Sequence, residues 1–312
     1  MRVPPRTDPG GVMKAARAAV SSFFSALRLS GRNGNRTALT SELSLPSPPR
    51  IGLALGGGFA RGIAHAGVLR VFERHNIPIH CIAGVSAGAI AAAAYASGAS
   101  PDEIAAAGCA MRFGDIARWS LCRMGFVVSE RMKRFLERLL KRYRFEEMRI
   151  PLGVIATDLC TGAPVPFHGS GDVVLPIRSS CSYPGLFQPV RCDGRLLVDG
   201  AMSMEIPAGL CRKLGATHVI SVHLPPPTAG PPPRNVFQVV NRCFQIMQTR
   251  TESIWRAESD LVIAPDVGHV EWDGFTSGPE MLEAGEAAAL SAVPIIRNWT
   301  SETVSSLISE VA

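Results

Sequence analysis

The amino-acid sequence predicts an α/β fold in which a mostly parallel central sheet carries helices on both faces. From residue 51 onward, short apolar runs alternate with helix-like stretches, and this alternation is typical of parallel strands joined by helices. The chain of 312 residues is 46% hydrophobic, which is enough to bury one substantial core or two modest ones. Its 30 glycines and 24 prolines favour a fold with many tight turns.

Each expected strand is a short apolar run, and helical stretches lie between the runs. The run at 51–55 ends at consecutive glycines before a helix at 62–75, and the run at 79–85 precedes an alanine-rich helix at 87–97. Residues 81–101 carry no charge, but they are mostly Ala, Gly and Ser, so they are interpreted as buried rather than membrane-spanning. The other strands are expected at 152–157, 196–198, 218–224 and 261–263, and the other helices at 130–142, 207–214, 235–257 and 279–297.

Three segments are expected along the chain: a basic, flexible extension and linker at 1–50, one folded domain at 51–298, and a C-terminal tail at 299–312. The first segment carries a net charge of +6, so the rest of the chain sums to zero. A neutral folded body argues against a nucleic-acid partner. Residues 13–29 could form a basic amphipathic helix that anchors the chain on a membrane surface, or they belong to an unstructured extension.

The eight cysteines are scattered along the chain. They form no C-x-x-C pair and no Cys/His cluster at zinc-ligand spacing, so the sequence predicts no metal site. In a chain of this size the pattern favours reduced thiols, which predicts a cytoplasmic protein.

A candidate nucleophile, Ser86, lies in a G-x-S-x-G pattern between Gly84 and Gly88. An apolar strand precedes this serine and an alanine-rich helix follows it, which is the setting of a nucleophile elbow. The two glycines keep side-chain bulk away from the adjoining strand and helix. Alone, the pattern also fits a buried turn serine that carries no chemistry.

Three glycines at 56–58, followed by Phe59 and Arg61, lie at another strand-to-helix junction. Backbone N–H groups there can converge on an anion, helped by the positive end of the following helix. A dinucleotide fingerprint would need glycine where Arg61 stands. One helix and one strand separate this loop from Ser86, so both loops should emerge at one sheet edge. This arrangement favours the oxyanion of an acyl transfer over a phosphate.

A candidate base, Asp199, closes the expected strand at 196–198 and precedes Gly200. A carboxylate that ends a buried strand at the same sheet edge could take the proton of Ser86. Partial desolvation would raise its basicity above that of an ordinary aspartate. The plainer interpretation is a turn aspartate that caps its own loop.

In this order and spacing, the motifs resemble those of the patatin-like phospholipase family of lipid acyl hydrolases. The resemblance covers residues 51–298 and rests on G-G-G-x-x-R-G at 56–62, G-x-S-x-G at 84–88 and D-G-A at 199–201. It implies a three-layer α/β/α catalytic domain with a Ser-Asp dyad that uses no histidine, metal or cofactor. The implied site residues are the nucleophile Ser86, the base Asp199, the oxyanion-hole residues Gly57, Gly58 and Phe59 with Arg61 holding their loop, and the elbow glycines Gly84 and Gly88.

The resemblance also implies a substrate and a reaction. A member of this family is expected to hydrolyse fatty-acyl esters of phospholipids or related lipids through an acyl-enzyme, with peripheral contact to a membrane. Residues 154–162 and 179–185 look like family segments that line or support the site. The family commonly has asparagine a few residues after the base, within what is here 202–207, and often an acid where His223 stands. Both departures concern substrate preference.

Two alternatives stay open on the sequence alone. His223 follows Ser86 and Asp199 in the chain order of α/β-hydrolase triads, so a Ser-Asp-His esterase is a competing hypothesis. The other is a non-catalytic protein that binds lipids or nucleotides with the same loops. His65, on the first helix, is interpreted as a packing or capping residue.

Residues 130–145 place apolar side chains on one helical face and basic side chains elsewhere. This pattern predicts a surface helix docked on the core. A second hypothesis is a helix at the mouth of the site that meets anionic lipid headgroups.

Overall fold

The computed structural model describes residues 48–309 except 117, 123, 227–231 and 272, and the expected helix at 13–29 lies outside the described residues. The strands are β1 (Ile51–Leu55), β2 (Cys81–Gly84), β3 (Arg118–Cys122), β4 (Gly125–Val128), β5 (Leu152–Asp158), β6 (Pro164–His168), β7 (Val190–Cys192), β8 (Arg195–Asp199), β9 (His218–Val222) and β10 (Leu261–Ile263). The α-helices are α2 (Ala64–Arg74), α3 (Ala87–Ser97), α4 (Pro101–Ala110), α5 (Phe113–Ile116), α6 (Glu130–Leu139), α7 (Val174–Ser180), α8 (Ala208–Lys213), α9 (Val236–Arg256) and α10 (Gly278–Ser309). Short 3₁₀ helices are η1 (Phe59–Ile63), η2 (Phe145–Glu147), η3 (Gly200–Met202) and η4 (Phe275–Ser277).

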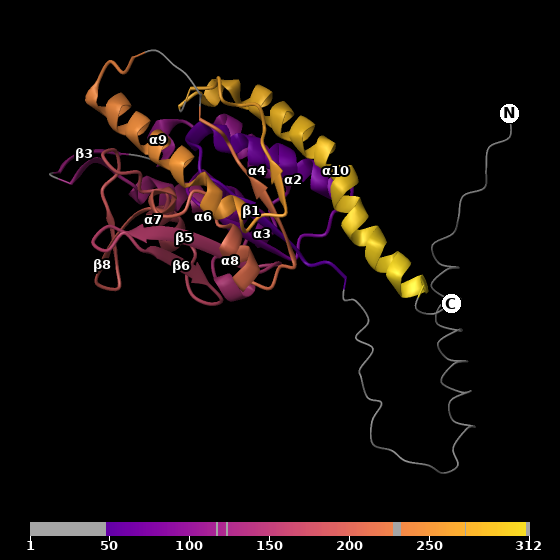
Figure 1. Ribbon diagram of the computed structural model, residues 1–312. Helices are drawn as coiled ribbons and strands as arrows, with labels where there is room; N and C mark the ends of the chain where they lie inside the picture. Colours follow the sequence, from indigo (N-terminus) through magenta and orange to yellow (C-terminus); the bar gives the residue numbers. More distant parts are fainter. Residues whose placement is uncertain (1–47, 117, 123, 227–231, 272, 310–312) are drawn as a thin grey trace, which may run out of the picture. The chain divides into compact units, whose positions relative to one another are not determined.

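The central sheet has the strand order β10-β9-β1-β2-β5-β8-β7, with β6 paired to β5. The pairs from β10 through β5 are parallel, whereas β5–β6, β5–β8 and β7–β8 are antiparallel. The sheet lies between helices, as Figure 1 shows. The prediction of a mostly parallel sheet covered by helices is therefore confirmed.

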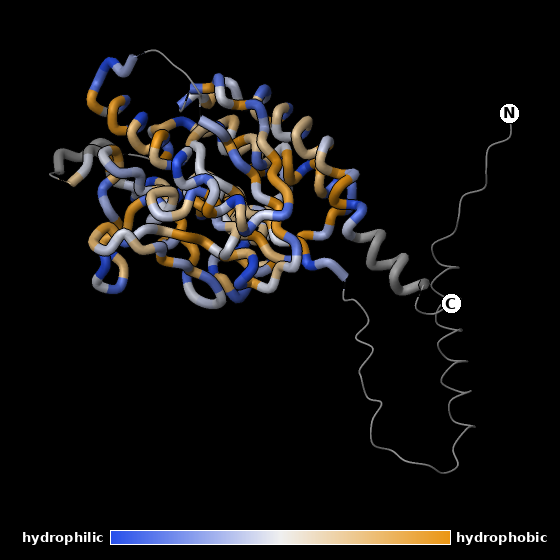
Figure 2. The backbone as a smooth tube through the Cα atoms, in the orientation of Figure 1, coloured by the Kyte–Doolittle hydropathy of each residue, from blue (hydrophilic) through white to orange (hydrophobic). Residues whose placement is uncertain are grey.

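The two faces of the sheet bury different clusters because side chains alternate along each strand. In β1, Leu53 and Leu55 belong to the large cluster that includes α2, α3 and α10, while Ala54 belongs to the smaller cluster with α8. A Cβ at Gly52 would lie 2.8 Å from the Cβ of Cys211, so α8 packs directly on the strand backbone there. Figure 2 shows the apolar strands in the interior. Each fully buried Leu or Ile contributes about 1.5–3 kcal/mol.

Strands β2 and β8 meet end to end along one edge of β5. Successive strand residues direct their backbone groups to opposite edges, and the odd-numbered positions Pro151 and Leu159 bond to β2 and to β8 respectively. Because β2 is parallel and β8 antiparallel to β5, their carboxyl ends face each other. The last residues of these strands, Gly84 and Asp199, pair with β5 positions two residues apart. Asp199 thus approaches from the direction opposite to the one that an all-parallel sheet would give.

Several boundaries differ from those expected. The helix expected at 279–297 continues to Ser309, across the expected domain boundary at 298. The sequence patterns did not indicate α4, α7, β6 or β7. None of the described helices combines the length and apolar character that a membrane-spanning segment requires.

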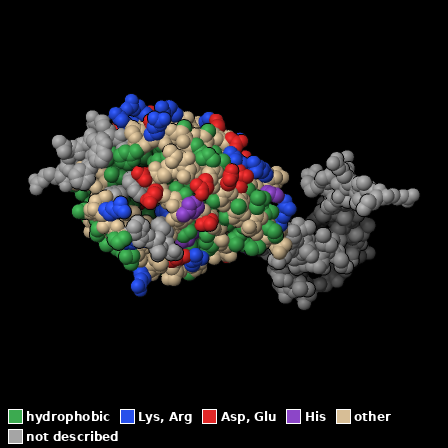
Figure 3. All heavy atoms as spheres, turned by 90° about the horizontal axis from the view of Figure 1, so that it is seen from above, with side chains coloured by type: hydrophobic (Ala, Val, Ile, Leu, Met, Phe, Trp, Pro, Cys, Tyr) green, Lys and Arg blue, Asp and Glu red, His purple; other side chains and the backbone are tan. Residues whose placement is uncertain are grey.

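Helix α6 packs its apolar face on the core, as the first of the two hypotheses predicted. Met132, Phe135, Leu136 and Leu139 are buried, while Arg134 and Arg138 are exposed. On the face in Figure 3, acidic and basic side chains are interspersed with hydrophobic patches. That mixture agrees with a folded body whose charges sum to zero.

Candidate active site

Ser86 lies at a sharp turn between β2 and α3, in a backbone conformation that is rare for a residue with a side chain. Its φ is 54° and its ψ is −125°, a geometry that stores strain of about 1–3 kcal/mol. A Cβ added at Gly84 or Gly88 would lie inside 3.0 Å of backbone atoms, those of α3 for Gly84 and of Leu55 and Gly56 for Gly88. Glycine is therefore required at both positions for the turn to close.

The hydroxyl of Ser86 contacts the carboxyl of Asp199 directly. Ser86 Oγ donates a hydrogen bond to Asp199 Oδ2 over 2.7 Å, and both side chains are buried. Burial raises the pKa of Asp199 from 3.8 to about 7, although hydrogen bonds from the Ala201 amide and from Ser86 oppose the shift. A carboxyl that titrates near neutrality and touches a hydroxyl is equipped to accept its proton.

Two further side chains hold this pair in place, and neither was singled out individually from the sequence. Ser180, on α7, donates from its Oγ to the carbonyl of Ile155 over 2.6 Å and accepts from the Ser86 amide over 2.9 Å. Thr157, on β5, donates to the carbonyl of Asp199 over 2.9 Å. Both residues lie in segments noted for their family resemblance, but only the fold brings their hydroxyls to the dyad.

The glycine loop after β1 lies against Ser86. A Cβ at Gly57 would stand 3.3 Å from the Ser86 Cβ. Phe59 has a positive φ of 53°, which turns the backbone sharply at the end of the loop. In the described part of the chain, the amides of Gly57 and Gly58 donate to no protein acceptor. Two adjacent donors beside a serine hydroxyl are suited to a developing oxyanion.

Arg61 fastens this loop to the segment that follows β9. Its Nη1 donates to the carbonyl of Pro225 over 2.7 Å, and its backbone amide donates to the carbonyl of Gly58 over 3.2 Å. Burial lowers the pKa of this guanidinium, and the charge of Glu205 opposes that effect. The contacts agree with a role in holding the loop.

His65 is fully buried on α2, and its Nε2 lies 2.9 Å from the carbonyl oxygen of Gly56. Burial lowers its pKa to about 4, so the ring is neutral at pH 7 and Nε2 carries the proton toward the carbonyl. In the described ranges, Nδ1 has no hydrogen-bond partner. The sequence-based interpretation of His65 as a packing or capping residue is thus incomplete, because the ring also pins the first glycine of the loop.

Replacing His65 with leucine is expected to lower kcat about 10- to 100-fold with little change in KM, because the unpaired Gly56 carbonyl releases the loop beside Ser86. His65→Gln, which keeps an N–H donor, should recover part of the loss. Steady-state kinetics with thermal unfolding of both variants checks this. Equal kcat in the leucine variant and the unmodified protein would show that the loop needs no such pin.

His223 is occupied away from the dyad. Its Nε2 lies 3.2 Å from Glu205 and its Nδ1 lies 4.0 Å from Glu252, while its ring packs on Trp255. Glu205 also accepts a hydrogen bond from the Trp255 indole over 3.0 Å. The two departures noted in the sequence, at 202–207 and at His223, therefore contact each other. Ser86 meets Asp199 without an imidazole between them, a geometry that disfavours the Ser-Asp-His hypothesis.

A narrow cavity of about 40 Å³ opens beside Ser86. Its walls are apolar. They come from helices α3, α5 and α6, from the start of η1, from η4, and from the segments that follow α4 and α7. The lining residues are Phe59, Ser86, Ala87, Ile90, Met111, Ile116, Met132, Cys181, Phe187 and Phe275. The apolar lining suits contact with hydrocarbon rather than with polar groups.

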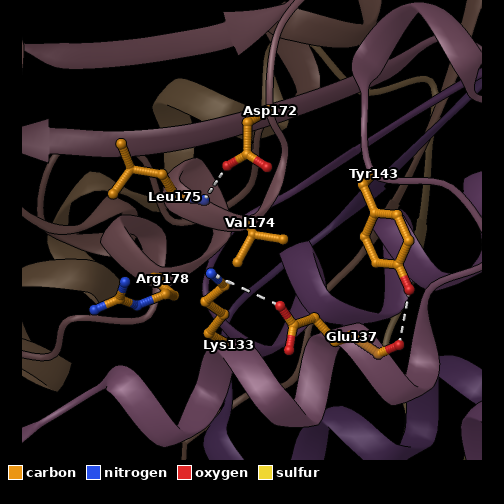
Figure 4. A pocket seen from close by; sticks show the side chains of 7 residues that line it. All are labelled: Lys133, Glu137, Tyr143, Asp172, Val174, Leu175 and Arg178. Atoms are coloured by element: carbon orange, nitrogen blue, oxygen red, sulfur yellow. Dashed lines mark hydrogen bonds and ion pairs between the residues drawn. The ribbon is translucent and has the colours of Figure 1, made fainter.

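A second cavity, of about 700 Å³, lies between α6 and α7 and contains no comparable chemistry. Figure 4 shows its charged side chains, of which Lys133 and Glu137 form an ion pair of 3.8 Å. Asp172 accepts a hydrogen bond from the Leu175 amide, and Arg178 lies 3.7 Å from Glu130. These groups are engaged with one another, and the cavity offers no nucleophile beside a base.

Among the described residues, no group of three or more His, Cys, Asp or Glu side chains is arranged to hold a metal ion. The expectation that the chemistry needs neither metal nor cofactor stays a prediction. The structure brings together four of the site residues expected from the sequence, which are Ser86, Asp199, Gly57 and Phe59.

Comparisons with known proteins show the family and the fold of this chain. The family profile described as patatin-like phospholipase matches residues 53–211. An uncharacterized NTE family protein of Mycobacterium tuberculosis is 34% identical over 188 residues, which are 59% of this chain and 52% of that protein. A lysophospholipase NTE1 of Mycosarcoma maydis is 32% identical over 180 residues, 55% of this chain and 9% of that protein. The chain thus spans about half the length of the mycobacterial relative.

Among solved structures, VipD from Legionella pneumophila is similar in fold. It aligns with a TM-score of 0.54 at 13% identity, covering 85% of this chain and 72% of VipD. At that identity the likeness concerns the architecture alone.

Proposed function

This chain belongs to the patatin-like phospholipase family, and from that membership we propose that it hydrolyses fatty-acyl esters of phospholipids or related lipids, with Ser86 as nucleophile and Asp199 as base. The observation that carries the proposal is the 2.7 Å contact between Ser86 Oγ and a buried carboxyl whose pKa is raised to about 7. The apolar lining of the cavity beside Ser86 supports a substrate that places hydrocarbon next to the reacting carbonyl.

In the first half of the reaction, Ser86 Oγ attacks the ester carbonyl carbon while its proton moves to Asp199 Oδ2. The carbonyl oxygen becomes an oxyanion that accepts hydrogen bonds from the amides of Gly57 and Gly58. When the tetrahedral intermediate collapses, the C–O bond to the alcohol breaks and Asp199 returns the proton to that oxygen. The fatty acyl group is now esterified to Ser86.

In the second half, water replaces the alcohol. Asp199 accepts a proton from the water as its oxygen attacks the acyl-enzyme carbonyl, and the same amides bind the new oxyanion. Collapse breaks the bond to Ser86 Oγ, which takes the proton back from Asp199. The free fatty acid leaves and the dyad is restored.

A fluorophosphonate probe is expected to label Ser86 covalently, because its phosphorus accepts attack by an activated serine. The measurement is the mass of the intact protein and of the peptide that carries residue 86. Ser86→Ala should remove the label, whereas Ser291→Ala, at an exposed serine of α10, should leave it unchanged. A folded protein that the probe leaves unmodified would contradict the proposal.

A further inference from the structure

Helix α9 (Val236–Arg256) has apolar residues on two opposite sides. On the inner side, Trp255 is buried, Phe244 packs edge-on against Tyr183 with ring centroids 5.6 Å apart, and Asn241 accepts a hydrogen bond from the Tyr183 hydroxyl. These contacts attach the helix to the rest of the domain. They do not account for the apolar residues on its other side.

The outer side carries a stripe of exposed apolar side chains. Its large apolar residues are each 48% to 79% exposed to solvent, and Cys243 among them is exposed as well. At 100° per residue the stripe occupies an arc of about 100° that points away from Trp255. Figure 2 shows apolar and polar turns alternating along α9. The stripe consists of Val236, Val239, Cys243, Ile246, Met247 and Ile254.

The charge on this helix is positive. It contains three arginines, Arg242, Arg250 and Arg256, and one acidic residue, Glu252, which forms an ion pair with Arg256. By its helical position, Arg250 lies within the apolar stripe. An exposed apolar stripe interrupted and flanked by arginine is the pattern of a helix that lies in the interface of an anionic bilayer.

The stripe is too small for a stable protein partner. From Val236 to Ile254 it extends for about 27 Å along one helix, and six side chains fall far short of the roughly 20–30 residues per side that a stable protein interface uses. Insertion into a bilayer has no such requirement, because binding increases with apolar area and each arginine near an anionic surface adds about 1 kcal/mol.

The inner side of α9 leads to the candidate active site. Tyr183, which contacts α9, also packs edge-on against Phe59 with ring centroids 5.8 Å apart. Phe59 lines the cavity beside Ser86. Two aromatic contacts, Phe244–Tyr183 and Tyr183–Phe59, therefore connect α9 to the cavity.

We propose that the outer face of α9 binds the surface of anionic phospholipid membranes and brings the Ser86 cavity to the lipid. The role of this contact in delivering substrate rests on the proposed function, whereas the binding itself does not. Arginines hold the phosphate-bearing surface, and the apolar stripe enters the boundary between headgroups and acyl chains.

The test is co-sedimentation of the full chain with vesicles of phosphatidylcholine, with and without phosphatidylglycerol, in a Ser86→Ala background so that no lipid is consumed. We expect binding that requires phosphatidylglycerol and weakens with salt. The double variant Val239→Gln/Met247→Gln should bind at least about tenfold more weakly, because two inserted apolar side chains are lost. Arg250→Gln should weaken binding about fivefold.

Matched controls use the same substitutions elsewhere. Leu290→Gln/Ile295→Gln exchanges two exposed apolar side chains of α10, and Arg138→Gln removes an exposed arginine of α6. Both controls should bind vesicles like the Ser86→Ala parent, and thermal unfolding should show that every variant is folded.

Three results would overturn the proposal: no binding of the parent to anionic vesicles, unchanged binding of the α9 double variant, or a parent dimer that the double variant dissociates. The last result would make a second copy of the chain the occupant of the stripe. Vesicle binding without fluorophosphonate labelling of the unmodified protein would reject the proposed function alone.

Discussion

Replacing Asp199 with asparagine is expected to lower kcat/KM for ester hydrolysis by roughly 10³-fold, the contribution of a well-placed general base. Asparagine keeps the shape and can still accept the hydrogen bond from the Ala201 amide. It cannot take the proton of Ser86. In the unmodified protein, kcat/KM should rise with pH through a limb near 7, because only the ionised carboxylate acts as base and its pKa is raised to about 7. The variant should lose this limb.

The same substitution should raise stability above neutral pH. The Asp199 carboxyl releases its proton at about pH 3.8 in the unfolded chain but only near pH 7 in the folded one. Between these two pH values the carboxyl is ionised in the unfolded chain but still protonated in the folded one. The free energy of unfolding therefore falls as the pH rises, by on the order of 4 kcal/mol over the whole pH range between them. Asparagine does not titrate. The Tm of Asp199→Asn should therefore exceed that of the unmodified protein at pH 8, and the difference should shrink toward pH 4.

An exposed aspartate provides the control for both measurements. Asp273→Asn, far less buried, should change neither kcat/KM nor the pH dependence of Tm. If Asp199→Asn keeps its activity, the carboxyl is not the base. If the variant is less stable than the unmodified protein at pH 8 as well as at pH 4, the carboxyl is not a buried group held at an energetic cost.

The fold class and the central residues could be predicted from sequence because they depend on local rules. A strand, a glycine-flanked serine and an alanine-rich helix define the turn at Ser86 without any distant contact. The same is true of Ile51–Leu55 and the glycines that follow it. Short apolar runs and turn residues can be recognised from a few consecutive positions, and the motifs around Ser86 and the glycine loop are each that short.

What the sequence could not supply was the direction from which distant strands arrive. Asp199 was expected at the carboxyl edge of a parallel sheet, yet β8 is antiparallel to β5 and meets β2 head-on. Hydrogen-bond partners across the fold were equally hidden: Ser180 lies 94 residues from Ser86, and nothing in its neighbourhood marks it as the acceptor for that amide. His65 was expected only to pack or cap, since its carbonyl partner becomes apparent once η1 brings α2 back onto the loop.

The α9 stripe shows a related limit. A hydrophobic pattern along 235–257 predicted a helix correctly, but periodicity alone does not tell which of two apolar sides faces the core. Only the packing of Phe244 and Trp255 identifies the inner side, and so leaves the other side as a surface. The amphipathic helix α6, whose pattern is cleaner, turned out to use its single apolar face for the core.

Replacing Gly88 with alanine is expected to destabilise the protein strongly. The new Cβ would lie inside 3.0 Å of the carbonyl oxygens of Leu55 and Gly56, and these are backbone atoms that no side-chain rotation can move. To relieve the clash, α3 must separate from β1, which opens the core and moves Ser86 away from the glycine loop. We expect a loss of about 3 kcal/mol or more and, in a domain of this size, a Tm lower by about 6–12 °C.

Gly114→Ala is the matched control, because the added Cβ at Gly114 meets no atom within 4 Å and the residue lies in helix α5. There alanine should leave Tm unchanged or raise it slightly, since it restricts the unfolded chain and favours the helix.

Thermal unfolding and fluorophosphonate labelling of the two variants separate the effect on stability from the effect on the active site. Because the methyl at position 88 disturbs both the strand and the loop, Gly88→Ala should lose labelling even at temperatures where it remains folded. A Gly88→Ala protein with unchanged Tm and full labelling would mean that α3 and β1 are not packed backbone to backbone, and the elbow would then need another explanation.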